Sequence, residues 1–331
     1  MKKVLALMLS IVLVMSLASC GTTDKKDDTA KTGSNGSKST YKVGIVQLVQ
    51  HPALDAATKG FKDALTKKLG DKVVFDVKNA SGDSATCSTI VGQFVSGNYD
   101  LILANATPAL QAAASATNKI PILGTSITHY GTALDIDNWT GTTGINVSGT
   151  SDLAPLDKQA EMIKELYPNA KKVGILYCSA EANSKFQSTT IQKYLKDLGF
   201  ESKEYTFADS NDVASVTKAA CTDSDVIYIP TDNTAASCAA TINNVAEPAK
   251  VPIIAGEEGI CKGCGVATLS ISYYDLGYTT GEMAYEVLAN GADISKMEIK
   301  YAPKFTYEYM ADRAEKLGVK IPSNYEAIKA K

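Results

Sequence analysis

The sequence contains few of the residues and motifs on which catalytic and metal sites are commonly built. It has two histidines in 331 residues, His51 and His129, and neither lies in a recognisable turn for the nucleophile of a serine hydrolase. The phosphate loop GxxxxGK[ST], the HExxH metal motif, the GxSxG elbow and a GxGxxG after the opening strand are all absent. We therefore expect a protein that is not an enzyme and that carries no cofactor.

A strong net charge is also missing. The net charge is -3, and charged residues make up 21% and hydrophobic residues 45% of the chain, close to the averages of soluble globular proteins. This charge gives no reason to expect a nucleic-acid partner. The length is enough for two domains of roughly 100–200 residues each.

The first forty residues differ from the rest of the chain. Two lysines precede an apolar run at 4–17, which is too short for a comfortable membrane span and ends in small residues. This N-terminus resembles a bacterial lipoprotein signal, which implies removal of residues 1–19 and lipidation of Cys20. An ordinary secretory signal cut nearby is the alternative. Residues 20–40 have no large apolar side chain to bury, so we expect a flexible tether.

Six cysteines remain after Cys20. An even number in an exported chain permits disulfides, and Cys261 and Cys264 are spaced for a local bridge. A lone CxxC is a weak zinc signal because a structural zinc site needs four ligands. We expect disulfides or free thiols rather than a metal at these cysteines: Cys87, Cys178, Cys221, Cys238, Cys261 and Cys264.

One short apolar pattern occurs twice, as YKVGIVQ at 41–47 and KVGILY at 172–177. Each copy is followed by a polar turn and a stretch with helical spacing, which indicates a β-strand and α-helix unit at the start of each of two halves. In open α/β sheets, ligands bind beyond the carboxyl ends of the strands. Two such halves facing each other would place these strand ends on a shared cleft.

The alternation of strands and helices continues through both halves and predicts an α/β fold with parallel sheets flanked by helices. Residues 127–151 break the pattern, and we expect a long functional or connecting loop there. A last strand at 298–301 and a helix at 305–317 are expected to finish the chain. The other expected strands lie at 42–46, 73–77, 100–104, 120–124, 201–207, 225–229, 251–255 and 266–270.

Several short motifs, in this order and spacing, resemble extracytoplasmic substrate-binding lipoproteins of ABC importers, in the group often described as tryptophan or tyrosine binding. Each motif alone is weak, but together they cover nearly all of 41–322. They are QHPALD at 50–55, NATP at 105–108, GTS at 124–126, ANS at 182–184, SNDV at 210–213, PTDNT at 230–234 and YYDLG at 273–277.

The resemblance implies a type I periplasmic-binding-protein fold of two Rossmann-like lobes joined by a hinge of several strands. It implies residues 41–152 plus 256–292 in the first lobe and 153–255 plus 293–331 in the second. It also implies an ABC permease and ATPase as partners, and an extracytoplasmic protein held to the membrane through its lipid alone. The sequence CKGC at 261–264 departs from the glycine-containing loop expected there.

A cleft that binds a free amino acid must pair both a carboxylate and an ammonium, because an unpaired buried charge is costly. Polar residues after the first-half strands are our candidates for the carboxylate, and two acids after the second-half strands are our candidates for the ammonium. Glu257 could instead be a surface loop acid, Asp232 a helix cap, and the other candidates helix caps or turn residues. The ligand-binding candidates are Gln47, His51, Asn105, Thr107, Thr125, Ser126, Ser179, Asn183, Ser184, Asp232, Asn233 and Glu257.

The expected ligand is an amino acid, with tryptophan, tyrosine or phenylalanine favoured. An aromatic slot could be supplied by Trp139, Tyr177, Tyr228 or Tyr273, or these rings could be core residues. A ligand-sensing lipoprotein for another small solute, such as a branched amino acid or a nucleoside, is the alternative, and a hydrolase is a more distant one.

Overall fold

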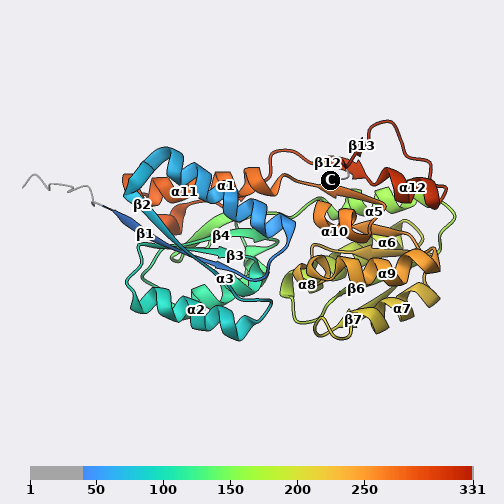
Figure 1. The fold of residues 1–331 in the computed structure, drawn as a ribbon, viewed down its shortest axis with the longest axis horizontal. Helices are drawn as coiled ribbons and strands as arrows, with labels where there is room; N and C mark the ends of the chain where they lie inside the picture. Colours follow the sequence, from blue (N-terminus) through green and yellow to red (C-terminus); the bar gives the residue numbers. More distant parts are fainter. Residues whose placement is uncertain (1–39, 330–331) are drawn as a thin grey trace, which may run out of the picture. The chain divides into compact units, whose positions relative to one another are not determined.

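The computed structural model describes residues 40–329. The predictions for the signal at 1–19, for Cys20 and for the tether up to residue 39 lie outside the described residues. Within the described range, no helix has both the length and the apolar character needed to cross a membrane. The described residues belong to one compact unit that contains two α/β lobes, as Figure 1 shows. The predicted two-lobe α/β architecture is confirmed.

The first lobe is built on a six-stranded parallel sheet in the order β11-β5-β4-β3-β1-β2. Helices α1 and α11 cover one face of the sheet, and α2 and α3 cover the other (Figure 1). The elements are β1 (Tyr41–Gln47), α1 (Pro52–Leu69), β2 (Val73–Asn79), α2 (Ser84–Ser96), β3 (Leu101–Asn105), α3 (Thr107–Ala116), β4 (Ile122–Ile127), α4 (Tyr130–Ala133), β5 (Val147–Ser151), α11 (Tyr273–Asn290) and β11 (Lys300–Tyr301), with short 3-10 turns at Gly70–Lys72 and Ile294–Lys296.

The second lobe is built on a seven-stranded sheet in the order β13-β12-β10-β9-β8-β6-β7, parallel except where β12 runs antiparallel to β10. Its elements are α5 (Leu156–Leu166), β6 (Lys172–Cys178), α6 (Ala182–Asp197), β7 (Glu201–Phe207), α7 (Val213–Asp223), β8 (Val226–Ile229), α8 (Asn233–Ser237), α9 (Ala239–Ala249), β9 (Ile253–Ala255), α10 (Glu258–Cys264), β10 (Ala267–Ser270), β12 (Thr306–Tyr309), α12 (Ala311–Lys316) and β13 (Glu326–Ala327).

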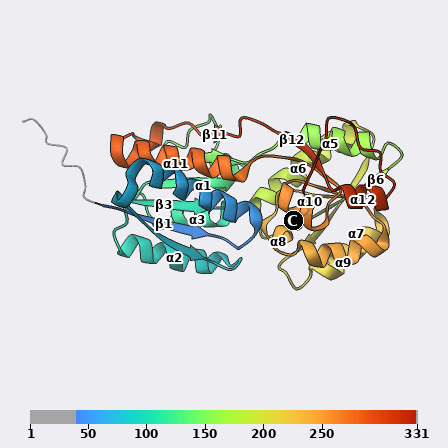
Figure 2. The same cartoon turned by 45° about the horizontal axis from the view of Figure 1, so that its top comes forward.

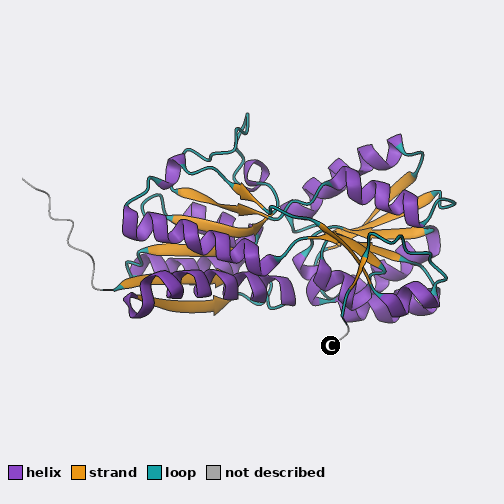
Figure 3. Cartoon of the chain, turned by 90° about the horizontal axis from the view of Figure 1, so that it is seen from above, coloured by secondary structure: helices purple, strands orange, loops and turns teal. Residues whose placement is uncertain are grey.

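Three segments pass between the lobes, at 152–155, 271–272 and 302–305, and Figure 3 shows chain connecting the two sheets. The expected return to the first lobe at residue 256 is wrong. Strand β10 pairs with β9 and β12, so the chain stays in the second lobe through Ser270. The expected start of the last second-lobe segment at 293 is also wrong, because β11 pairs with β5 in the first sheet.

Two local expectations are corrected as well. The expected loop at 127–151 contains strand β5, whose sequence VSGTS lacks an apolar pattern although all five residues are buried. The expected helix at 305–317 is a strand, β12, followed by the shorter helix α12. In both places pairing with a neighbouring strand outweighs the local sequence preference.

Helices α1 and α11 lie side by side in Figures 1 and 2, and glycines sit where they touch. A Cβ added at Gly277 would overlap the backbone carbonyl of Ala57, and one added at Gly60 would overlap the carbonyl of Tyr274. Glycine is therefore required on both helices for this close approach. The contact fixes the start of α1 and the start of α11 relative to each other.

We expect a Gly277→Ala variant to lose about 1–3 kcal/mol of unfolding free energy, because the new methyl group must push the α1 backbone away. Urea denaturation followed by circular dichroism measures the change. Gly92→Ala is the matched control, because Gly92 is an exposed helical residue and no atom lies within 4 Å of the place that its new methyl group would take. That control should gain up to about 1 kcal/mol from helix propensity. Equal stability of the two variants would contradict the packing argument.

Candidate binding site

A small cavity lies where the carboxyl ends of strands from the two lobes meet. Its volume open to the centre of a water molecule is about 10 Å³, which is room for about one water. A solute the size of an amino acid therefore needs the lobes to separate before it can enter. The first lobe and its connection contribute His51, Leu54, Ser126, Thr128, Asp152 and Tyr273, and the second contributes Asn183, Thr231, Asp232, Asn233, Ala236 and Glu257.

Three residues that line this cavity each have a buried polar atom without a hydrogen-bond partner in the described part of the chain: His51 Nδ1, Ser126 Oγ and Asn183 Oδ1. The three residues are only 5–6% exposed. A buried polar group without a partner costs about 1–3 kcal/mol, so such groups usually mark a place where something else binds. Ser126 also has a positive φ of 57°, a conformation that is uncommon outside glycine and often found at functional sites.

The hydrogen bonds around two of these atoms fix their chemical role. Asn233 donates its side-chain amide to Glu181 at 2.6 Å, so its Oδ1 is the acceptor facing His51 Nε2 at 3.3 Å. Burial lowers the pKa of His51, so the ring is neutral and its Nδ1 is an acceptor. Asn183 donates its amide to Glu181 and to the Thr231 carbonyl, which leaves Asn183 Oδ1 as an acceptor too.

Asp152 is the acid at the first-lobe side of the cavity. Thr128 donates its hydroxyl to Asp152 at 3.1 Å, and Tyr273 donates its phenol to the other oxygen at 3.0 Å. Burial raises the pKa of Asp152 to about 6. The cavity is lined by no lysine or arginine among the described residues, so Asp152 has no cationic partner and is suited to receive one from a ligand.

Glu257 faces the cavity from the second lobe and caps helix α10. Its carboxylate accepts from the backbone N–H groups of Gly259 and Ile260. Burial raises the pKa of Glu257 to about 7, in spite of these two hydrogen bonds. Glu257 is therefore a buried helix cap and not the surface loop acid of the alternative interpretation, and it also lines the cavity.

Asp232 and Glu181 form a second buried acidic pair. Asp232 accepts from Ala235 N–H, Cys178 N–H and the Ser184 hydroxyl, each at 2.7 Å. Burial raises the pKa of Asp232, and the charge of Glu181 raises it further. Both oxygens of Asp232 are thus used in capping α8 and in tying it to β6 and α6. The structure supports the cap interpretation of Asp232 more directly than the ammonium contact that we expected.

Glu181 ties the start of α6 to the start of α8 in the second lobe. Its carboxylate accepts five hydrogen bonds, from the backbone and side chains of Asn233 and Thr234 and from the side chain of Asn183. The residue is 3% exposed. It thereby orients two side chains, Asn183 and Asn233, that face the cavity.

Two contacts join the lobes beside the cavity. One is the His51 to Asn233 hydrogen bond already described. The other is a stack of the His129 and Phe186 rings, with centroids 4.5 Å apart and planes 3° from parallel. His129 precedes α4 in the first lobe, and Phe186 lies on α6 in the second.

Of the twelve predicted ligand-binding residues, six line the cavity: His51, Ser126, Asn183, Asp232, Asn233 and Glu257. The other six do not, which corrects the expectation of direct contact. Gln47 and Asn105 bind Thr58 of α1 instead. Thr125 bonds Thr150, and Ser184 bonds Asp232. Thr107 is buried at the start of α3, and Ser179 is exposed and bonds the Phe207 carbonyl.

The expected aromatic slot is also corrected in part. Tyr228 is fully buried in the core and donates to Gln159 at 2.5 Å, and Tyr177 donates to Glu204. Trp139 packs on Tyr130, with ring centroids 6.3 Å apart. Only Tyr273 of the four lines the cavity.

Sequence reasoning missed Thr128, Asp152, Thr231 and Glu181. The sequence motifs could have identified two of them, because Thr231 belongs to the motif PTDNT and Glu181 directly precedes ANS. Asp152 had no such signal, since it follows a strand that the sequence does not show.

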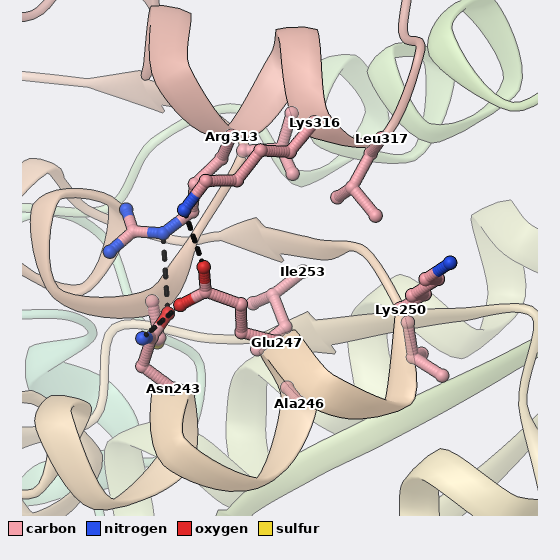
Figure 4. A pocket seen from close by; sticks show the side chains of 11 residues that line it. Asn243, Ala246, Glu247, Lys250, Ile253, Arg313, Lys316 and Leu317 are labelled. Atoms are coloured by element: carbon pink, nitrogen blue, oxygen red, sulfur yellow. Dashed lines mark hydrogen bonds and ion pairs between the residues drawn. The ribbon is translucent and has the colours of Figure 1, made fainter.

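One of several other hollows, of about 270 Å³ by the same measure, lies between α9 and α12 (Figure 4). Arg313 donates to the carbonyls of Cys261, Lys262, Gly263 and Gly265, and to Asn243. Lys316 pairs with Glu247 at 2.6 Å. These polar groups already have partners, so the hollow shows no sign of a ligand and the arginine serves to cap α10.

The six cysteines of the described residues all carry free thiols. Burial raises the pKa of Cys87 and Cys178 to about 11, so these thiols are protonated and unreactive near neutral pH. Within residues 40–329 no cluster of His, Cys, Asp and Glu is arranged to hold a metal ion.

A family model described as "ABC transporter substrate binding protein" matches residues 42–330. A "Tyrosine-binding protein" of Clostridioides difficile (strain R20291) is 40% identical over 294 residues, covering 87% of this chain and 84% of that protein. Two solved structures are similar as well. A Streptococcus pneumoniae ABC domain in complex with L-Trp has a TM-score of 0.84 and 33% identity, and covers 88% of this chain and 100% of that one.

The second solved structure is the ligand-free, open form of a Clostridium difficile substrate-binding protein with adhesive properties. Its TM-score is 0.67 at 38% identity, with the same coverage of 88% and 100%. The sequence is thus more similar to the open protein, but the fold superposes better on the tryptophan-bound one. In the present chain the lobes are in contact beside the cavity, which has room for about one water.

Proposed function

Because the chain belongs to the family of ABC transporter substrate-binding proteins, we propose that its interlobe cavity captures a free aromatic L-amino acid. The protein would release this ligand unchanged to an ABC permease and its ATPase, on the outer side of the cell membrane. The named relatives support this assignment, since one is a tyrosine-binding protein and another was solved with L-Trp.

One observation on this chain carries the proposal: the cavity offers mainly hydrogen-bond acceptors. Asp152 and Glu257 are carboxylates, and His51 Nδ1 and Asn183 Oδ1 are acceptors without a donor. A matching ligand must bring several donors. The ammonium of an amino acid supplies three N–H groups, and an indole N–H or a phenol O–H supplies one more.

The ligand's carboxylate needs donors, and Ser126 is the side chain that remains for it. Its unpaired hydroxyl lies near the end of strand β4, and hydroxyls and backbone N–H groups are suitable carboxylate partners. In this arrangement the ammonium lies between Asp152 and Glu257, and His51 or Asn183 accepts from the ring. Tryptophan and tyrosine should therefore bind more tightly than phenylalanine, which has no ring donor.

The test is a thermal-shift screen followed by calorimetry of the purified protein against the twenty amino acids, nucleosides and simple sugars. We expect the largest stabilisation from L-tyrosine or L-tryptophan, and chemically unchanged ligand on recovery. Preferred binding of a branched aliphatic amino acid, a nucleoside or a sugar would overturn the ligand assignment and leave the family membership intact.

We also propose that Cys20 carries the lipid that holds the protein at the membrane. The support is the apolar run at 4–17 ending in LAS before that cysteine. A Cys20→Ala variant should leave the membrane fraction and appear in the soluble fraction. Cys238→Ala, which changes a partly buried cysteine in the second lobe, is the matched control and should stay with the membrane. Retention of the Cys20→Ala variant on the membrane would contradict the anchor.

A further inference from the structure

Four acidic side chains surround the interlobe cavity, and we call them the carboxylate cluster: Asp152, Glu181, Asp232 and Glu257. They are 4%, 3%, 1% and 2% exposed. Asp152 belongs to the first lobe and the other three to the second. Three of them line the cavity, and Glu181 lies directly behind Asn183 and Asn233.

Among residues 40–329, the titratable groups that face this cluster bring no positive charge near pH 7. Tyr130 and Tyr273 face Asp152, and Glu258 and the thiols of Cys261 and Cys264 face Glu257. Glu258 is itself paired at the surface with Lys262 at 2.5 Å. On the far side, His51 faces Glu181 and Asp55, and Cys178 faces Asp232. His51 is neutral, because burial lowers its pKa.

A cluster of this kind makes closure of the lobes costly by itself. Ionised carboxylates that leave water need a cation or a proton, and unpaired buried charge is strongly unfavourable. In the closed form burial raises the pKa of Asp152 to about 6 and that of Glu257 to about 7. With the lobes apart, water reaches these groups and their pKa values return toward the ordinary range.

We propose that the carboxylate cluster opposes closure of the lobes in the absence of a ligand, and that the ammonium of the bound ligand removes this opposition. The proposal rests on the function proposed above and adds a reason why the closed state depends on the ligand. Any ligand whose primary ammonium reaches Asp152 and Glu257 should therefore allow the lobes to close, whether or not the ligand also has a carboxylate.

The sign of the pH dependence follows from linkage. Asp152 and Glu257 have higher pKa values in the closed form and bind more protons there, so these two carboxyls favour closure without ligand as the pH falls. Burial lowers the pKa of His51, so its contribution to closure has the opposite sign. The contribution of these two carboxyls to closure is fully present below the ordinary carboxyl pKa. It is lost as the pH rises through about 6 and about 7, the pKa values of Asp152 and Glu257 in the closed form. At about pH 8 the ligand-free protein should be open.

Small-angle X-ray scattering of the purified protein tests the proposal. We expect the ligand-free radius of gyration to fall toward the ligand-bound value between about pH 8 and about pH 6.5, a range in which an exposed His51 stays largely neutral. An Asp152→Asn variant should be more compact than wild type at the higher pH without ligand. Asp197→Asn, at an exposed position on α6, should match wild type. A ligand-free radius that does not change with pH in wild type would overturn the proposal, whether or not the variant folds.

Two ligand fragments separate this proposal from the proposed function. Tyramine, which has the ammonium but no carboxylate, should compact the protein at about pH 8, and 3-(4-hydroxyphenyl)propionate, which has only the carboxylate, should not. Compaction by the acid and not by the amine would overturn the proposal. If no amino acid compacts the protein at any pH, the proposed function fails, while the pH series on ligand-free protein still decides the role of the cluster.

Discussion

An Asp152→Asn variant is expected to bind its aromatic amino acid roughly 30-fold more weakly than wild type, or worse. Removing one partner of a buried, hydrogen-bonded charge pair costs about 2–5 kcal/mol, and each 1.4 kcal/mol is about tenfold in affinity. We use the lower end of this energy range because the variant also removes part of the free-energy cost of closing the lobes. Isothermal titration calorimetry at about pH 8, where the closure term is largest, measures the loss.

Two milder substitutions of residues that donate to Asp152 should weaken binding less. Thr128→Val and Tyr273→Phe each remove one hydroxyl donor to Asp152 and leave its charge in place. A neutral hydrogen bond contributes about 0.5–1.5 kcal/mol, so each variant should lose roughly tenfold or less. The exposed Asp197→Asn variant should bind as wild type does. An Asp152→Asn affinity within threefold of wild type would show that the ammonium binds elsewhere.

A Glu181→Ala variant is expected to lose about 2–4 kcal/mol of unfolding free energy. The substitution removes the acceptor of five hydrogen bonds and leaves the N–H groups of Asn233 and Thr234 buried without partners. Each buried unsatisfied group costs about 1–3 kcal/mol, offset where water enters. Urea unfolding followed by circular dichroism measures the loss.

Two further measurements define the role of Glu181. Glu315→Ala, on the exposed face of α12, is the control and should change stability by less than about 0.5 kcal/mol. The pKa of Asp232 should fall in Glu181→Ala, because the charge of Glu181 is one of the causes that raise it. An unchanged Asp232 pKa, followed by NMR titration, would mean that the two carboxylates do not interact.

The order of strands and helices could be predicted because each local pattern agrees with the final fold. The strands expected at 42–46 and 172–177 are β1 (Tyr41–Gln47) and β6 (Lys172–Cys178). Both are central strands covered on two faces, so their sequences are nearly continuous apolar runs. The cleft at the strand ends followed from the same parallel topology.

The predictions that failed concern segments whose structure is decided by residues far away in the sequence. Strand β5 reads Val-Ser-Gly-Thr-Ser and becomes a strand through pairing with β4 and β11. Asp152, the acid directly after it, was consequently missed. Asp232 and Glu257 both line the cavity, but a sequence cannot show that their oxygens also accept hydrogen bonds from nearby backbone N–H groups.

The three side chains that meet around Asp152 all belong to one lobe. Thr128 follows β4, Asp152 follows β5, and Tyr273 begins α11, which is packed on α1 through Gly277. Separation of the lobes leaves this group assembled, and we expect an arriving ligand to bind it before the second lobe closes on it with Asn183 and Glu257. Substitutions around Asp152 should then act partly on the association rate. Substitutions at Asn183 and Glu257, which touch the ligand after closure, should act mainly on the dissociation rate and hence on how long the ligand stays bound.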